Sequence, residues 1–277
     1  MTSQTTSREE VTRANQVYFD RISHTYEADP RQRYGLFAGN ARRRYREFLA
    51  GSLDAIRRGV LVNVACGTGN MLDLEQELGL RGVGLDISMN MLKLARRHHG
   101  RLFAADFYAM PFRDGSVSCA TGLALLHHVY DHAGFFAELH RVLMPGGLFY
   151  ADYDPNYYAV TRIKTHPVLG PLWRRYERYS DGVREIDDTV DAETFALADY
   201  WAVKEPGLRR EDLERAVRGA GFADVTVICH SDGPSLRAPR TGRLPHKVLE
   251  GMLRLVGERD YGHRAKNLAM IVRKAGA

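Results

Sequence analysis

The run Leu61-Val62-Asn63-Val64-Ala65-Cys66-Gly67-Thr68-Gly69-Asn70-Met71-Leu72 decides the fold of this chain. Its first residues are apolar and partly β-branched, which predicts a buried strand that stops at a glycine-rich turn and passes directly into a helix. The first turn of a helix leaves backbone N–H groups free, and anionic or nucleotide ligands commonly bind there. The run therefore predicts a strand, a loop and a helix with a nucleotide-like ligand at the loop.

A second short strand with an acidic end follows. The residues Gly82-Val83-Gly84-Leu85-Asp86-Ile87-Ser88 end an apolar run on Asp86, roughly 20 residues after the glycines, where such folds place an acceptor for ribose hydroxyl groups. The dinucleotide fingerprint GxGxxG is incomplete in both possible frames, because Ala65 and Asn70 interrupt one and Leu72 interrupts the other. A pyrophosphate clamp for a dinucleotide is therefore disfavoured.

The same loop resembles a known family. The string Val64-Ala65-Cys66-Gly67-Thr68-Gly69 is similar to motif I of the class I S-adenosylmethionine-dependent methyltransferases. Four further segments resemble that family in the same order: Ala104-Ala105-Asp106-Phe107, 111–117, 119–131 and 138–147. Over residues 17–151, 208–227 and 267–274 the chain is similar to the ubiquinone/menaquinone-biosynthesis (methyltransferase type 11) small-molecule group.

This resemblance implies a fold and a cofactor. The fold is α/β, a Rossmann-like doubly wound sheet of seven strands with the last one antiparallel, with helices on both faces and a substrate-cap insertion. The cofactor is S-adenosylmethionine, which becomes S-adenosylhomocysteine when its methyl group goes to an O, N or C atom of a small-molecule acceptor. The alternation of strand and helix patterns along the chain independently favours a parallel sheet covered on both faces.

Cofactor-binding residues follow from the resemblance. Asp86 would accept from the ribose hydroxyls, Asp106 would accept from the adenine amino group, and Phe107 would lie against the adenine ring. Tyr26, at the end of an expected N-terminal lid helix, would contact the methionine carboxylate, although packing would explain this tyrosine equally well. The other expected cofactor residues lie on the same loops and strand ends: Ala65, Cys66, Gly67, Thr68, Gly69, Ile87, Ser88, Met91 and Leu123.

Two residues depart from the family pattern. Asn63 stands where an acid is usual, and we expect its amide oxygen to accept a hydrogen bond from the cofactor's ammonium group. Ser118 stands where an aspartate is common. These departures keep open a methyltransferase-like protein that binds the cofactor without transferring methyl, and a nicotinamide-dependent oxidoreductase on the same sheet is the other alternative.

Candidate catalytic residues follow the expected fourth strand. Methyl transfer from a sulfonium needs mainly alignment and exclusion of water, and a base only where the acceptor must lose a proton. His127 and His128 have a suitable ordinary pKa, and strand alternation predicts that one of them, His128 by family analogy, faces the methyl group. The alternative is that both histidines only form hydrogen bonds and shape the pocket. Tyr153, Asp154 and Tyr157, just beyond the fifth strand, could orient the acceptor, although Tyr157 equally suits packing within the cap.

No metal ligand set is apparent in the sequence. His128 and His132 have i,i+4 spacing, yet neither a third ligand nor an HExxH pattern accompanies them. The three cysteines are widely spaced in apolar runs, which predicts reduced thiols rather than disulfides or a zinc site. The stretch Asp154-Pro155-Asn156-Tyr157 superficially resembles a signature of DNA amino-methyltransferases, but it follows the fifth strand and lacks the second proline.

The strand and helix patterns divide the chain into four parts. Residues 1–58 form a tail (1–14) and a helical lid, residues 59–152 the cofactor-binding core, residues 153–207 a substrate cap, and residues 208–277 the rest of the sheet with a second insertion at 231–266. Strands are expected at 60–65, 82–86, 101–105, 118–124, 147–152, 224–229 and 267–274, and helices at 41–57, from Ser88, from 135 to Pro145-Gly146, and at 210–220.

Composition limits the remaining function classes. The chain has 277 residues, a net charge of +5 and a pI of about 9.1, but its basic residues are scattered, so a nucleic-acid partner is not expected. It has no apolar run of 18 residues, and its first ten residues are polar, so we expect no membrane span and a cytoplasmic protein. The sequence leaves the acceptor and the oligomeric state open.

Overall fold

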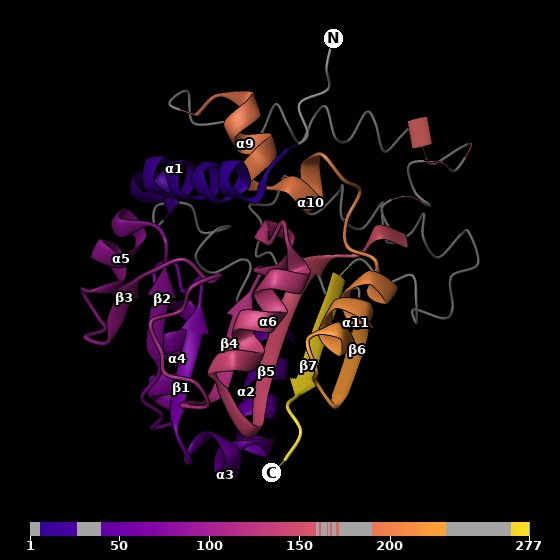
Figure 1. The fold of residues 1–277 in the computed structure, drawn as a ribbon. Coiled ribbons are helices and arrows are strands. Elements are labelled where there is room, and N and C mark those ends of the chain that lie inside the picture. The colour runs from indigo at the N-terminus through magenta and orange to yellow at the C-terminus, as the bar shows by residue number, and fades with distance from the viewer. Residues whose placement is uncertain are drawn as a thin grey trace.

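The computed structural model describes residues 6–26, 40–158, 190–230 and 267–276, together with 161, 165, 167, 170 and 171. Its centre is a seven-stranded sheet with the strand order β3-β2-β1-β4-β5-β7-β6 (Figure 1). The strands are β1 (Val60–Val64), β2 (Val83–Asp86), β3 (Leu102–Ala104), β4 (Val117–Leu123), β5 (Leu143–Pro155), β6 (Asp224–His230) and β7 (Asn267–Arg273). Strands β1 to β5 pair in parallel, whereas β7 runs antiparallel to both β5 and β6. The predicted sheet is confirmed.

Helices cover both faces of the sheet. One face carries α2 (Asn40–Gly51), α3 (Leu53–Ile56), α4 (Asn70–Glu77) and α5 (Met89–Ala95), and the other carries α6 (His132–Val142) and α11 (Arg210–Gly219). Above the carboxyl ends of the parallel strands lie α1 (Arg8–Tyr26), α9 (Ala192–Ala198) and α10 (Tyr200–Val203) (Figure 1). In open α/β sheets, ligands bind at that edge, so these three helices cover the expected site. Within the described residues, no helix has the length and apolarity that crossing a membrane requires.

Three expected boundaries are wrong. The predicted loose tail is helical from Arg8, because Val11 and Ala14 bury their side chains and so hold the first turns of α1 in place. The single helix expected at 41–57 is divided at Ser52 into α2 and α3. Helix α6 ends at Val142 rather than near Pro145, since Leu143 already has extended backbone angles and pairs with β4.

Strand β5 contains a bulge at Tyr153. Its register with β7 shifts between Asp152 and Asp154, and Tyr153 has a φ of +75°. An extra residue in a strand interrupts the alternation of side chains between the two faces. Accordingly, Asp152 Oδ2 accepts from Arg44 Nε of α2 at 2.9 Å, whereas Asp154 Oδ1 lies 2.8 Å from the ring of His127. The bulge thus directs two nearby carboxylates to different partners.

Candidate functional site

The loop between β1 and α4 is held by backbone hydrogen bonds and by Asp86. The N–H of Cys66 donates to the carbonyl of Leu85 at 2.9 Å, and the N–H of Gly67 donates to Asp86 Oδ2 at 2.8 Å. Gly67 has a φ of +53° and Gly69 a φ of +97°, a region that glycine enters without steric cost. The sequence-predicted loop therefore has the conformation that its glycines allow.

Two features of this loop fit a ligand. A Cβ atom added to Gly67 would meet no described residue within 4 Å, so the described part of the chain leaves the space in front of Gly67 open. The hydroxyl of Thr68 is buried and has no hydrogen-bond partner among the described residues. Buried polar atoms normally find a partner, which makes this hydroxyl available to a bound molecule. Both features are consistent with a cofactor whose polar part lies against the loop.

Asp86 is the charged group of this loop. Its Oδ1 accepts from the N–H of Ser88 at 2.8 Å, while Oδ2 accepts from Gly67. Burial raises the pKa of Asp86 to about 6, against the lowering effect of these backbone hydrogen bonds, and the nearby charge of Asp20 raises it further. Each carboxylate oxygen has two lone pairs, so both can still accept from ribose hydroxyls. Tyr26 lies near this carboxylate. Burial, followed by the charge of Asp86, raises the pKa of the Tyr26 hydroxyl to about 12.

Asp20 joins the lid helix to the site and was not predicted from the sequence. Its Oδ1 accepts from Ser88 Oγ at 2.6 Å and from the N–H of Asn90 at 3.0 Å, at the start of α5. The next residue towards the N-terminus, Phe19, packs edge-on against the ring of His128 with centroids 5.2 Å apart. Helix α1 therefore contacts both the cofactor loop region and the histidine pair.

The other expected cofactor residues lie around the same strand ends. Asp106 Oδ1 accepts from the N–H of Tyr108 at 2.9 Å, and Phe107 is buried with its ring edge-on to Phe135. Met91 is buried against Ile22 of α1. Ile87, Leu123 and Ala65 are half-buried, and Ala65 also has left-handed backbone angles.

Asn63 lies in a buried polar network. We name Tyr45, Asn63, Glu75 and Thr121 the Glu75 network. The Asn63 amide nitrogen donates to Glu75 Oε1 at 3.4 Å and to Thr121 Oγ1 at 3.2 Å, and the Tyr45 hydroxyl donates to the same Glu75 oxygen at 2.5 Å. Burial raises the pKa of Glu75 to about 7. The Asn63 amide nitrogen is thus a donor to an acid on α4, and acceptance from the cofactor's ammonium group by the amide oxygen stays a prediction.

Asn63→Asp is expected to destabilise the fold by about 2–3 kcal/mol at pH 8, because it puts a second buried carboxylate beside Glu75 and removes a donor. The folded-state pKa of the new aspartate would be raised above its unfolded value, so the penalty is present at high pH and shrinks as the pH falls towards 5. Urea unfolding at both pH values measures it. The double variant Asn63→Asp, Glu75→Gln should recover most of the stability, and equal stability of the single and double variants would refute this account.

Ser118 also has a structural role. Its hydroxyl lies 2.7 Å from the carbonyl of Ile56 and 3.1 Å from that of Val60, so it links β4 to the connection between α3 and β1. This departure from the family pattern therefore lies away from the cofactor loop. It gives no argument against methyl transfer.

The two candidate catalytic histidines lie side by side. They belong to the 3-10 helix η2 (Leu126–His128), and their ring centroids are 4.1 Å apart. The prediction that strand alternation separates them is wrong, because β4 ends at Leu123 and the chain turns before it reaches them. Both imidazoles are therefore available to one site.

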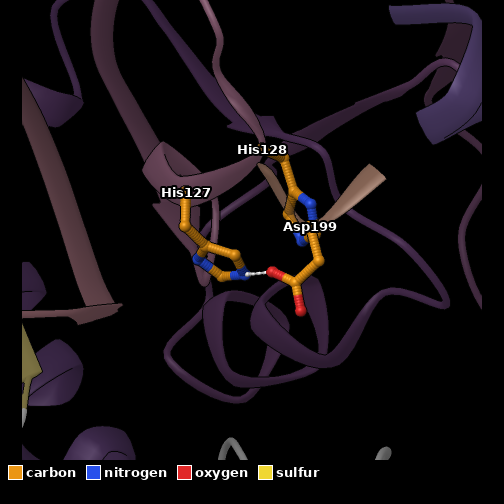
Figure 2. Close-up of side chains that lie close together, drawn as sticks. All are labelled: His127, His128 and Asp199. Carbon is orange, nitrogen blue, oxygen red and sulfur yellow. Dashed lines mark ion pairs between the residues drawn. The ribbon is translucent and has the colours of Figure 1, made fainter. Parts of the chain in front are cut away.

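Each histidine has an oxygen partner at Nδ1. His127 Nδ1 lies 2.8 Å from Asp154 Oδ1, and His128 Nδ1 lies 2.5 Å from the carbonyl oxygen of Ala198. A carbonyl oxygen only accepts, so His128 carries its proton on Nδ1 and its Nε2 is an acceptor. The Nε2 of His127 lies 3.5 Å from Asp199 Oδ1 (Figure 2).

The surroundings move the pKa values of the two imidazoles in opposite directions. Burial, followed by the neighbouring His127, lowers the pKa of His128 to about 4, so this ring is neutral at ordinary pH. Burial also opposes charge on His127, but the hydrogen bond to Asp154 and the charges of Asp199 and Asp154 outweigh it and raise its pKa. The pair thus combines one neutral imidazole with one more basic imidazole.

Asp199 was not among the predicted site residues, and Asp154 was expected only as a possible contact to the acceptor. Asp154 follows the bulge in β5, and a strand pattern gives no signal for a bulge. Asp199 follows α9 in the expected cap, far along the chain from the histidines. Of the two predicted acceptor tyrosines, Tyr153 is the bulged residue of β5, next to Asp154. Tyr157 stacks under the Arg209 guanidinium at 4.0 Å in a small cavity whose lining includes neither His127 nor His128.

Comparisons with known proteins agree with the geometry. A family model described as a methyltransferase domain matches residues 62–151. The demethylmenaquinone methyltransferase of Lactococcus lactis is 30% identical over 187 residues, which cover 62% of this chain and 69% of that protein. The demethylmenaquinone methyltransferase of Renibacterium salmoninarum is 31% identical over 140 residues, which cover 50% of this chain and 54% of that protein. The match thus spans about half the length of the latter relative.

A solved structure shares the fold. The crystal structure of a SAM-dependent methyltransferase from Archaeoglobus fulgidus aligns with a TM-score of 0.53 over 90% of this chain and 99% of that one, at 15% identity. Identity this low speaks for the fold alone.

Proposed function

Because the chain belongs to the class I S-adenosylmethionine-dependent methyltransferases, in their menaquinone-biosynthesis-like group, we propose that it transfers a methyl group from S-adenosylmethionine to a small-molecule acceptor. One observation carries the proposal. Phe19 and Asp20, neighbours on α1, contact His128 and Ser88, so one helix links the histidine pair to the strand end whose Asp86 holds the loop of Gly67. Such an arrangement suits a donor on the loop and an acceptor at the histidines.

The residues of the loop would hold the cofactor. Asp86 binds the ribose hydroxyls, the Thr68 hydroxyl and the space in front of Gly67 accommodate the methionine half, and Asp106 and Phe107 bind the adenine. When bound, S-adenosylmethionine supplies an activated methyl group on a sulfonium, and the chain aligns the acceptor and excludes water with α1, α9 and α10.

The histidine pair would activate the acceptor. His128 stays neutral and presents Nε2, whereas His127 is oriented by Asp154. We propose both as catalytic residues that act on a proton of the acceptor or orient it. Tyr153 and Tyr157 remain candidate acceptor contacts at the edge of the site. The names of the demethylmenaquinone methyltransferase relatives suggest a quinol-like acceptor as the first to test.

Calorimetric titration and a transfer assay test this function. The protein should bind S-adenosylmethionine and S-adenosylhomocysteine but not NAD or NADH, and cell extract incubated with methyl-labelled cofactor should yield a labelled small molecule identified by mass spectrometry. Binding of NADH instead would support an oxidoreductase. Cofactor binding without any labelled product across extracts and quinols would support a protein that binds the cofactor for another purpose.

The affinity for S-adenosylmethionine is expected to fall as the pH drops through about 6. The pKa of Asp86 is raised to about 6, and only the carboxylate accepts from both ribose hydroxyls. A charged acceptor contributes on the order of 1.5–3 kcal/mol per bond, so Asp86→Ala should weaken binding at least tenfold. Calorimetry from pH 5 to pH 8 measures both effects, and Asp86→Asn should flatten the pH profile. An unchanged affinity in Asp86→Ala would remove this residue from the site.

A further inference from the structure

Three side chains near the acceptor side converge on one point. His127, His128 and Asp199 each offer a ligand atom, and these atoms lie within 4.8 Å of one another (Figure 2). The two histidines come from η2, whereas Asp199 comes from the segment between α9 and α10. All three are largely covered, since the side chains of His127 and Asp199 are 12% and 16% exposed.

The outer hydrogen bonds of both imidazoles are those of metal-binding histidines. A histidine that binds a metal through one ring nitrogen nearly always donates the other N–H to a carboxylate or a backbone carbonyl. His127 has Asp154 at Nδ1, and His128 has the carbonyl of Ala198. Both rings are therefore fixed with Nε2 as the remaining ligand atom.

The carboxylate of Asp199 has an unsatisfied oxygen atom among the described residues. Its Oδ1 is buried and has no hydrogen-bond partner among the described residues, although His127 Nε2 lies 3.5 Å away. Metal–ligand distances of about 2.0–2.2 Å in a tetrahedron put ligand atoms about 3.3–3.6 Å apart. The distance between His127 Nε2 and Asp199 Oδ1 already fits, and no separation has to close by more than about 1.5 Å, a shift that small side-chain rotations supply.

We propose that His127, His128 and Asp199 bind one divalent zinc-like metal ion, with a fourth position left for an oxygen atom of the methyl acceptor. Two imidazoles and one carboxylate are the ligand set of catalytic zinc sites, whereas Mg²⁺ and Ca²⁺ prefer oxygen ligands alone. The role of the fourth position rests on the proposed function, and with the ion bound both Nε2 atoms would be ligands, so the ion would take the place of an imidazole base. A hydroxyl bound to such an ion loses its proton to solvent more readily, which favours an acceptor with a hydroxyl group.

The sequence could not show this site. Spacing alone pairs His128 with His132, and it led to the expectation of no metal. In the structure, His132 Nε2 lies 3.0 Å from the carbonyl of Leu126 and does not belong to the cluster. The third ligand instead comes from Asp199 in the cap.

Metal titration of the untagged full chain tests the proposal without acceptor or cofactor. Zn²⁺ should bind with a stoichiometry of one by calorimetry, and Co²⁺ in its place should give the intense visible absorption of a four- or five-coordinate site. Asp199→Asn should weaken binding at least tenfold, and Asp154→Asn by 10- to 100-fold through the orientation of His127. The exposed His98 lies outside the cluster, so His98→Gln is the matched control and should bind as the parent does.

Two outcomes would overturn the proposal. One is no binding of Zn²⁺ or Co²⁺ by the parent at 1:1 stoichiometry, and the other is equal binding by the parent and by Asp199→Asn. S-adenosylmethionine affinity, measured in parallel on each variant, confirms that it is folded, and Asp199→Ser replaces Asp199→Asn if the latter does not fold. A protein that binds the cofactor but no metal would retain the proposed methyltransferase function and lose this site only.

Discussion

Gly67→Val is expected to lower the affinity for S-adenosylmethionine at least 100-fold while the protein still folds. Gly67 has a φ of +53°, and a Cβ there would enter open space in front of the loop. The valine side chain would fill the volume that the methionine half of the cofactor needs, and a β-branched residue is strained in this backbone region. Calorimetric titration of the purified variant measures the loss.

A second glycine in the same conformation separates occlusion from strain. Gly79, at the far end of α4, has a φ of +73° and also has nothing within 4 Å of an added Cβ. Gly79→Val should therefore lose a similar amount of stability, on the order of 1–2 kcal/mol, and bind the cofactor normally. If Gly67→Val binds normally too, the cofactor does not lie against this loop and the assignment of the loop fails.

His128→Ala is expected to lower kcat by about 10²- to 10⁴-fold with little change in cofactor affinity. The neutral His128 presents Nε2 beside the more basic His127, and removing it takes away either an acid–base group or a metal ligand. Single-turnover transfer to the acceptor found by the labelling screen measures the rate. His132→Gln changes a neighbouring half-buried histidine outside the cluster and should leave the rate close to that of the parent.

The adjacent variant has a different expected effect. His127→Ala removes the imidazole from the buried Asp154, whose Oδ1 would then accept only from the backbone N–H of residue 127. Asp154 Oδ2 already has no hydrogen-bond partner among the described residues. Breaking a buried pair typically costs about 3–5 kcal/mol, so this variant should lose stability first. Normal turnover in both alanine variants would mean that neither histidine is catalytic and that alignment alone carries the reaction.

The fold was largely predictable because its elements are encoded locally. Apolar runs ending at Gly67 or Asp86 set the parallel strands, and all seven expected strands are present within a few residues of their predicted ends. The errors fall where long-range packing overrides a local signal. Val11 and Ala14 make the tail helical by burial against partners that no local pattern identifies.

The candidate site was predictable only in part. The loop, Asp86 and the histidine pair follow motifs, so the sequence located them. Asp20, Asp154 and Asp199 follow no motif, because each reaches the site through tertiary structure: a helix packed on the strand ends, a bulge, and a cap segment. The donor role of Asn63 was missed for a similar reason, since only the fold shows that Glu75 on the next helix lies within reach of its amide.

Because of the bulge in β5, the contact between His127 and Asp154 depends on the number of residues in that strand as well as on the identity of residue 154. Tyr153 is the extra residue at the bulge opposite β7, and Asp154 points to His127 because the extra residue is there. Deleting Tyr153 would keep every charged side chain, but it would turn the carboxylate of Asp154 towards the other face of the sheet. In this chain, a change of length by a single position would dismantle the site as surely as the loss of the aspartate itself.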